Sequence, residues 1–180
     1  MLRHPTKVPQ RSNMHRNPTT TLISADAPVA TATHGGRAKC LQRLVRLDLP
    51  VPRTVALSFD AVHGIASGDM PDIASVLKQF DAGDLLCVRP SSEDPDWGGP
   101  GAVLNIGMND ARYTQLCDTL GPNAASALYL RFVQSYAIHV ARLDPDMFDK
   151  VDGDGPDALT ETLRAYDAGE VEPLLAKIIS

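Results

Sequence analysis

Apolar and polar residues are spaced in two different ways in the first part of the chain. Helical spacing, with apolar residues three or four positions apart, alternates with short continuous apolar runs typical of buried strands. Prolines and glycines separate these segments. The predicted elements are a helix over 39–48, a strand over 55–59, a helix capped by Ser58 or Asp60, a helix over 69–83 with Asp69 as a possible cap, and strands over 85–88 and 103–106.

From residue 109 onward the spacing is helical only. Asn109 is placed to cap a helix that runs to Leu120, and a proline at 122 is placed in the first turn of a helix that runs to Leu143. The last predicted helices cover 156–168 and 172–179. The whole pattern predicts an α+β fold, in which a short mixed sheet with helices is followed by a helical subdomain.

The composition is typical of a globular chain with one domain, or with one domain and an appendage. The 180 residues are 43% hydrophobic and 22% charged, and no apolar run approaches the ~20 residues that a membrane-spanning helix needs. The net charge of -5 argues against a nucleic-acid partner, because phosphate backbones are bound by clustered Lys and Arg. The three widely spaced cysteines suggest neither a disulfide framework nor a zinc site, and they favour a reducing, cytoplasmic location.

Residues 1–33 differ in composition from the rest. The first 25 residues carry Arg3, Lys7, Arg11 and Arg16 without Asp or Glu, and they are rich in Pro, Thr, Ser and Asn. This composition predicts a flexible basic N-terminal arm over 1–33, with an organelle transit peptide as the alternative. Because these 25 residues carry +4 of a total of -5, residues 26–180 carry -9.

A pair of glycines followed by a cation stands at the expected start of the first helix. Backbone N–H groups at a helix start, beside the positive end of the helix dipole, form an anion site, so Gly35, Gly36 and Arg37 are candidates for binding phosphate. The stretch matches neither the Walker pattern nor the dinucleotide fingerprint. The alternative is that the glycines only make a tight turn and that Arg37 is a solvated residue of the first helical turn.

A second cation, Arg89, follows the strand over 85–88 and precedes a loop rich in Gly, Pro and Asp. A guanidinium in this position can bind two oxygens of a polyphosphate at once. We therefore expect Arg37 and Arg89 to converge on one triphosphate. Glu93, Asp94 and Asp96 in the loop are either metal ligands or solvated acids, and the composition favours solvated acids.

Three stretches resemble one enzyme family. "GGRAKCLQRLVRLDLPVPRTVALS" resembles the G-G-K-G-A-N-L…G-L-P-V-P-P-G-F segment of pyruvate phosphate dikinases and the related phosphoenolpyruvate synthases. "LLCVRPSSEDPDWGGPGAVLNIGMND" is similar to their V-R-S…PG…T-V-L-N-L-G-L-N-D segment, and "ALYLRFVQSYAIHVARLDPDMFD" is similar to the helix that follows it. The order of the stretches agrees, and the resemblance covers about residues 35–149.

The resemblance implies an ATP-grasp nucleotide-binding domain, with its N-terminal lobe over 34–108 and a helical subdomain over 109–180. The family's phosphate-contacting cations fall on Arg37 and Arg89, beside Gly35 and Gly36, and the ligand is ATP with Mg²⁺. The resemblance places the magnesium ligands in a second ATP-grasp lobe. The partners it implies are that lobe, a phosphohistidine domain and a pyruvate-binding barrel, so this chain by itself is not expected to complete the reaction.

The sequence departs from the family pattern at several positions. Arg37 replaces a lysine, Ala38 replaces a glycine, and Pro90 replaces the serine of V-R-S and removes an N–H. Lys39 is either a substitute for the family lysine or a solvent-facing helical residue. Two functions follow: an ATP-binding N-terminal portion of a dikinase-like phosphotransferase, or a free-standing, non-catalytic module that binds a phosphorylated ligand or regulates another protein.

Overall fold

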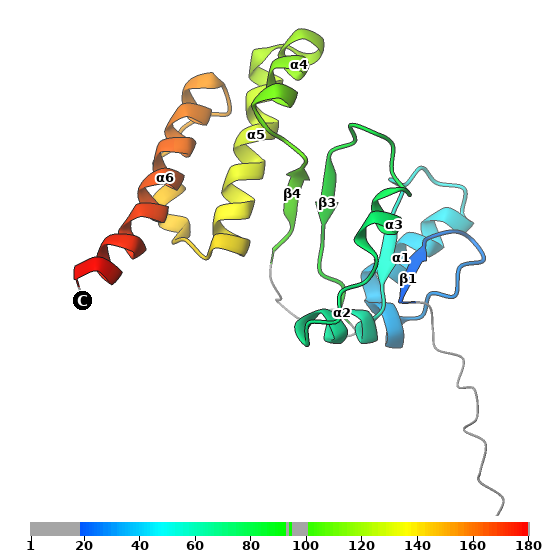
Figure 1. Ribbon diagram of the computed structural model, residues 1–180. Coiled ribbons are helices and arrows are strands. Elements are labelled where there is room, and N and C mark those ends of the chain that lie inside the picture. Colours follow the sequence, from blue (N-terminus) through cyan, green and yellow to red (C-terminus); the bar gives the residue numbers. More distant parts are fainter. Residues whose placement is uncertain (1–18, 93, 95–100, 180) are drawn as a thin grey trace, which may run out of the picture. The chain divides into compact units, whose positions relative to one another are not determined.

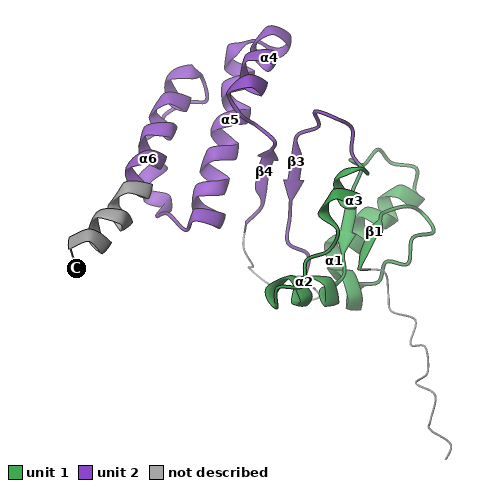
Figure 2. Cartoon of the chain, viewed as in Figure 1, with its two compact units in different colours: residues 1–79 green, residues 80–180 purple. Residues whose placement is uncertain are grey.

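The computed structural model describes residues 19–92, 94 and 101–179 (Figure 1). Within these residues the predicted α+β class is confirmed, but the prediction of one short mixed sheet is wrong, because the strands form two separate two-stranded antiparallel sheets. The chain divides into two compact units, unit 1 over residues 1–79 and unit 2 over residues 80–180 (Figure 2). This division differs from the sequence-based one, because β3 and β4 belong to the unit that also contains α4, α5 and α6.

The sheet of unit 1 begins inside the segment that composition assigned to a flexible arm. Strand β1 (Thr20–Leu22) pairs with β2 (Val55–Leu57), with Thr20 opposite Leu57 and Leu22 opposite Val55. The middle residues of the two strands, Thr21 and Ala56, are both buried. The prediction of an arm is therefore wrong for residues 19–33, because a run of threonines before a leucine has high strand propensity and finds a partner far along the chain. Residues 1–18 lie outside the described residues.

Three helices complete the described part of unit 1. Helix α1 covers Thr31–Arg46 and so begins earlier than the predicted residue 39. Helix α2 (Phe59–Ala66) is capped by Ser58, whose hydroxyl accepts a hydrogen bond from the Ala61 N–H at 3.2 Å. Of the two predicted caps, Ser58 and Asp60, the first is confirmed. Helix α3 (Ile73–Leu77) is much shorter than the predicted 69–83, and its cap is Asp72 rather than Asp69.

In unit 2, β3 (Leu86–Val88) and β4 (Val103–Ile106) pair antiparallel, with an irregularity in register between Leu86 and Val88. The predicted strands over 85–88 and 103–106 are confirmed to within a residue. The apolar run of β3 is nevertheless not buried, since Val88 is 62% exposed and Cys87 is also exposed.

The helices of unit 2 follow the predicted order. Helix α4 covers Asp110–Leu120, α5 covers Pro122–Tyr136, a π-helical turn η1 covers Ala137–Ala141, a 3₁₀ turn η2 covers Pro145–Phe148, and α6 covers Pro156–Ile179. The α-helix predicted to end at Leu143 therefore changes to π geometry at Ala137. The two helices predicted after residue 156 are one helix.

The core of unit 2 lies between its helices. Leu130 of α5 packs with Ala158 and Leu159 of α6, and partly buried side chains surround them, namely Tyr113, Tyr129, Val151 and Leu163. Gly169 is buried within α6, and a Cβ there would lie 2.7 Å from Cδ1 of Leu143. Among the described helices, none is both long enough and apolar enough to cross a membrane.

Candidate functional site

The glycine pair lies inside α1 and bends it. Gly35 has φ 83° and ψ 167°, which are non-helical, so a first turn over Thr31–His34 is separated from a helical segment that begins at Gly36. The conformation of Gly35 is open to glycine and strained for other residues. A helical segment that starts within the unit presents the positive end of its dipole at Gly36, as the anion-site interpretation requires. The turn interpretation is equally consistent with this geometry.

The residues after the glycines face in different directions. Arg37 is exposed, whereas Ala38 is only 5% exposed and packs with Val29 and Ala56 in the buried cluster of unit 1. The alanine that departs from the family glycine therefore contributes a core methyl group to this unit. Its side chain lies in the core and is not part of the candidate phosphate site.

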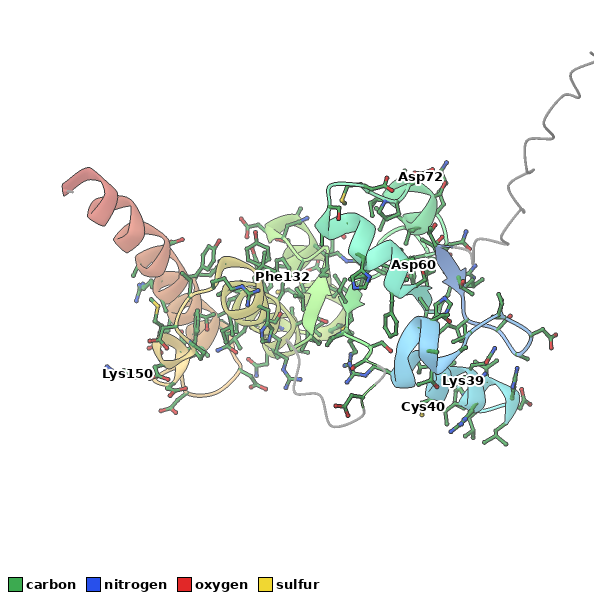
Figure 3. The ribbon with its side chains drawn as sticks, turned by 90° about the horizontal axis from the view of Figure 1, so that it is seen from below. Lys39, Cys40, Asp60, Asp72, Phe132 and Lys150 are labelled. Atoms are coloured by element: carbon green, nitrogen blue, oxygen red, sulfur yellow. The ribbon has the colours of Figure 1, made fainter. Side chains whose placement is uncertain are left out.

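Lys39 is partly buried, and its ammonium is hydrogen-bonded within unit 1. Its ammonium donates to the carbonyl of Val29 at 2.9 Å and to Oε1 of Gln42 at 2.7 Å. Figure 3 labels Lys39 and its exposed neighbour Cys40 on α1. The expectation that Lys39 faces solvent is therefore wrong, because a backbone carbonyl from the segment before α1 and a buried amide accept hydrogen bonds from its ammonium. Its role as a substitute for the family lysine stays a prediction.

Gln42, to which the sequence analysis gave no role, is 0% exposed. Its Nε2 donates to the carbonyl of Ala27 at 2.6 Å and approaches the carbonyls of Ser24 and Ala25 at 3.2 and 3.4 Å. Arg46 adds a bond from Nε to the Ala25 carbonyl at 2.8 Å. The polar side chains of Gln42 and Arg46 thus bond α1 to the segment between β1 and α1.

His34, immediately before the glycine pair, is the second residue that the sequence analysis left without a role. It is 1% exposed, its Nδ1 lies 2.8 Å from the hydroxyl of Thr33, and its Nε2 is buried without a hydrogen-bond partner among the described residues. Burial lowers the pKa of His34 from 6.5, because the charged imidazolium loses its hydration. Its position beside the glycines was the only signal in the sequence.

Arg89 follows β3, as predicted, and is exposed. Its Nε donates to Sγ of Cys87 at 3.3 Å. Arg37 belongs to unit 1 and Arg89 to unit 2, so their convergence on one triphosphate stays a prediction. Of the three acids in the following loop, Asp94 is exposed, and Glu93 and Asp96 lie outside the described residues.

The most specific part of the resemblance, "VLNIGMND", is explained by the fold. Asn105 adopts a left-handed φ of 52°, and its Nδ2 donates to the carbonyl of Leu128 in α5 at 2.9 Å. Gly107 has φ 105°, and Met108 is 5% exposed. These residues turn the chain from β4 into α4 and anchor the turn to α5.

The last two residues of this motif start α4. The side chain of Asn109 accepts the N–H of Arg112 at 2.9 Å, which confirms the predicted cap. Asp110 accepts the hydroxyl of Tyr129 at 2.9 Å, and burial together with this carboxylate raises the pKa of Tyr129. The motif therefore has a structural role here, independent of any ligand.

The described residues contain no group of three or more His, Cys, Asp or Glu side chains that could hold a metal ion. Within the same residues Cys40, Cys87 and Cys117 are free thiols. A comparison with protein-family models finds no match for this chain, and a search of curated proteins finds no similar sequence.

Proposed function

We propose that this chain is the ATP-binding N-terminal portion of a pyruvate phosphate dikinase-like phosphotransferase. In this proposal it contains the first lobe of an ATP-grasp domain and a helical subdomain. The observation that carries the proposal is the sequence resemblance over about residues 35–149. The bend at Gly35, which starts a new helical segment at Gly36 within unit 1, is compatible with it. A polyphosphate at Gly36 would receive backbone N–H donors and the helix dipole, and the exposed Arg37 would add a positive charge.

Arg89 of unit 2 is the second cation that we propose to contact the phosphates. It is exposed at the end of β3, where its planar guanidinium has two further nitrogen atoms besides the one bonded to Cys87. Phosphoryl groups in transfer carry negative charge on three oxygens, so two cations aimed at them stabilise the nucleotide and the transferred group. Magnesium would enter with the phosphates of ATP, and the resemblance assigns its protein ligands to the second ATP-grasp lobe.

The proposed reaction is completed by other parts of the enzyme. Magnesium-binding acids on a second lobe, a phosphohistidine domain and a pyruvate-binding barrel are the partners of this proposal. Binding of ATP by this chain is then weak, and phosphotransfer requires the second lobe. The three free cysteines are in keeping with a cytoplasmic site of action.

A non-catalytic binding or regulatory module is the second candidate. The observation that favours it is the structural role of "VLNIGMND", because its asparagines and glycine form the turn, the clamp on α5 and the cap of α4. A chain in which this motif serves only the fold would still resemble the dikinase family without binding ATP or transferring a phosphoryl group. In this case the ligand of Arg37 and Arg89 is a phosphorylated molecule other than ATP.

Isothermal titration of the full chain with Mg-ATP tests the first candidate. Replacing Arg37 or Arg89 by Ala is expected to weaken binding about tenfold or more, because a charge-assisted hydrogen bond contributes about 1.5–3 kcal/mol. Arg53→Ala, an exposed arginine of unit 1 outside the proposed site, serves as the matched control. Equal affinity in all four proteins contradicts the assignment of both arginines. No binding by the wild-type chain removes ATP as its ligand and leaves the second candidate.

A further inference from the structure

The bare ring nitrogen of His34 is the one buried imidazole nitrogen without a partner in the part of the chain that the structure describes. Leaving a buried polar atom without a hydrogen bond costs about 1–3 kcal/mol, and such atoms are rare in folded proteins. This one belongs to the residue that precedes Gly35, where the helix bends. A buried ring nitrogen without a partner, next to the proposed phosphate site, suggests that His34 responds to the bound ligand.

Only Nδ1 of the His34 ring has a hydrogen-bond partner among the described residues. It lies 2.8 Å from the hydroxyl of Thr33, and the tautomer of the ring decides which of these two atoms donates. In either neutral tautomer one ring nitrogen keeps a lone pair, so the buried imidazole is a base that can take up one proton.

Burial disfavours the charged form of His34, and no described acid of unit 1 is buried to offset this effect. Among the charged residues described in unit 1, only Lys39 is partly buried, and its ammonium is bonded to the Val29 carbonyl and to Gln42. The described acids of the unit are all exposed, and they are Asp26, Asp48, Asp60, Asp69 and Asp72. No buried acid among them compensates an imidazolium, and burial lowers the pKa of His34 accordingly.

An anion bound at the bend would favour the charged form of His34. His34 and Gly36 are two residues apart, so their Cα atoms are separated by at most ~7.6 Å. A negative charge ~10 Å from the ring in an environment of effective dielectric constant ~20 raises the proton affinity of an imidazole on the order of tenfold per charge. A triphosphate carries several negative charges, so its effect exceeds that of one charge.

We infer that polyphosphate binding at Gly35 and Gly36 is linked to the uptake of one proton by the imidazole of His34, so that affinity rises as pH falls. The proton comes from solvent and adds to the ring lone pair, and no bond in the ligand breaks. This inference rests on the proposed function, and it adds a pH-dependent control of that site by a residue outside the resembling motif.

Titration of the full chain with Mg-ATP at about pH 6.5, the ordinary pKa of histidine, tests the linkage. The measurement is made in two buffers of different ionisation enthalpy, and the difference in heat gives the number of protons taken up. The wild-type chain is expected to take up a larger fraction of a proton than His34→Gln. His63→Gln, which removes an exposed histidine of α2, is the matched control and is expected to behave as wild type. Titration of the phosphates of ATP is common to all three proteins.

Equal proton uptake by wild type and His34→Gln, with ATP binding intact, overturns the inference and leaves the proposed function standing. Absence of ATP binding by the wild-type chain overturns both. If His34→Gln does not fold, NMR titration of the imidazole of wild-type His34 decides the question. A rise in its pKa on addition of Mg-ATP supports the linkage, and an unchanged pKa in the bound protein contradicts it.

Discussion

Removal of the Gln42 side chain is the sharpest test of how unit 1 is held together. The amide of Gln42 is fully buried, and it joins α1 to the segment between β1 and α1. Gln42→Ala deletes the donor to the Ala27 carbonyl and the acceptor of the Lys39 ammonium. The helix propensity of alanine is high, so a loss of stability would come from these bonds and not from the helix.

The expected loss in the free energy of unfolding follows from two hydrogen bonds. The contact of Nε2 with the Ala27 carbonyl, at 2.6 Å, is a neutral hydrogen bond that contributes about 0.5–1.5 kcal/mol. The bond from Lys39 at 2.7 Å carries a charge and contributes about 1.5–3 kcal/mol. We therefore expect unfolding of unit 1 to become easier by about 2–4 kcal/mol.

Hydrogen exchange measured by mass spectrometry resolves the two units. Peptides from residues 23–46 are expected to lose protection in Gln42→Ala, and peptides from α5 are expected to keep it. Arg43→Ala is the matched control, because Arg43 is the next residue on α1 and is exposed. Equal protection in Gln42→Ala and Arg43→Ala would show that the side-chain bonds of Gln42 contribute nothing, and equal loss in both units would refute a local effect.

Two further predictions concern His34 and Asn105. Burial lowers the pKa of His34 in the folded state, so below about pH 6.5 the unfolded chain binds more protons than the folded one. The contribution of neutral His34 to the free energy of unfolding is therefore complete above that pH. It falls as the pH decreases towards the folded-state pKa. Urea midpoints between about pH 5 and 8 are expected to fall less in His34→Gln than in wild type, and parallel curves would contradict this cause. Asn105→Ala loses the bond to α5 and strains a φ of 52°, so it is expected to destabilise unit 2 by about 1–3 kcal/mol. Asn105→Gly loses the bond but relieves the strain, so a thermal melt that places it no higher than the alanine variant would contradict the backbone argument.

Local signals in the sequence predicted many elements of unit 2. The cap at Asn109, the end of α4 at Leu120 and the strand Val103–Ile106 agree with the structure. These elements depend on residues within one or two turns of each other, such as a capping amide or a proline in the first turn. Local chemistry of this kind is visible without the rest of the fold.

Where a distant residue decides the structure, the sequence prediction fails. The break predicted after residue 168 is absent, because Gly169 stays in α6 and leaves room for Leu143 and Met147. The helix over 69–83 is shortened to Ile73–Leu77, whose residues are not buried and so gain little from packing. Helical spacing alone did not reveal that this segment lacks a partner to cover it.

In the candidate site too, the sequence predicts what nearby residues decide and misses what distant residues decide. The sequence identifies the glycines and the two arginines, because a glycine pair before a cation and a cation after a strand are local patterns. It could not assign Lys39 and Gln42 to the segment between β1 and α1, or show that His34 is buried with a bare nitrogen.

The sequence by itself determined the α+β class, most starts of the described helices and the positions of β2, β3 and β4, since caps, prolines and apolar spacing act over a few residues. Only the tertiary structure decided that β1 belongs to the fold, that a glycine bends α1 from within, and which polar side chains are buried. The physical reason is that burial and hydrogen-bond partners depend on residues far apart in the chain, which meet only when it folds.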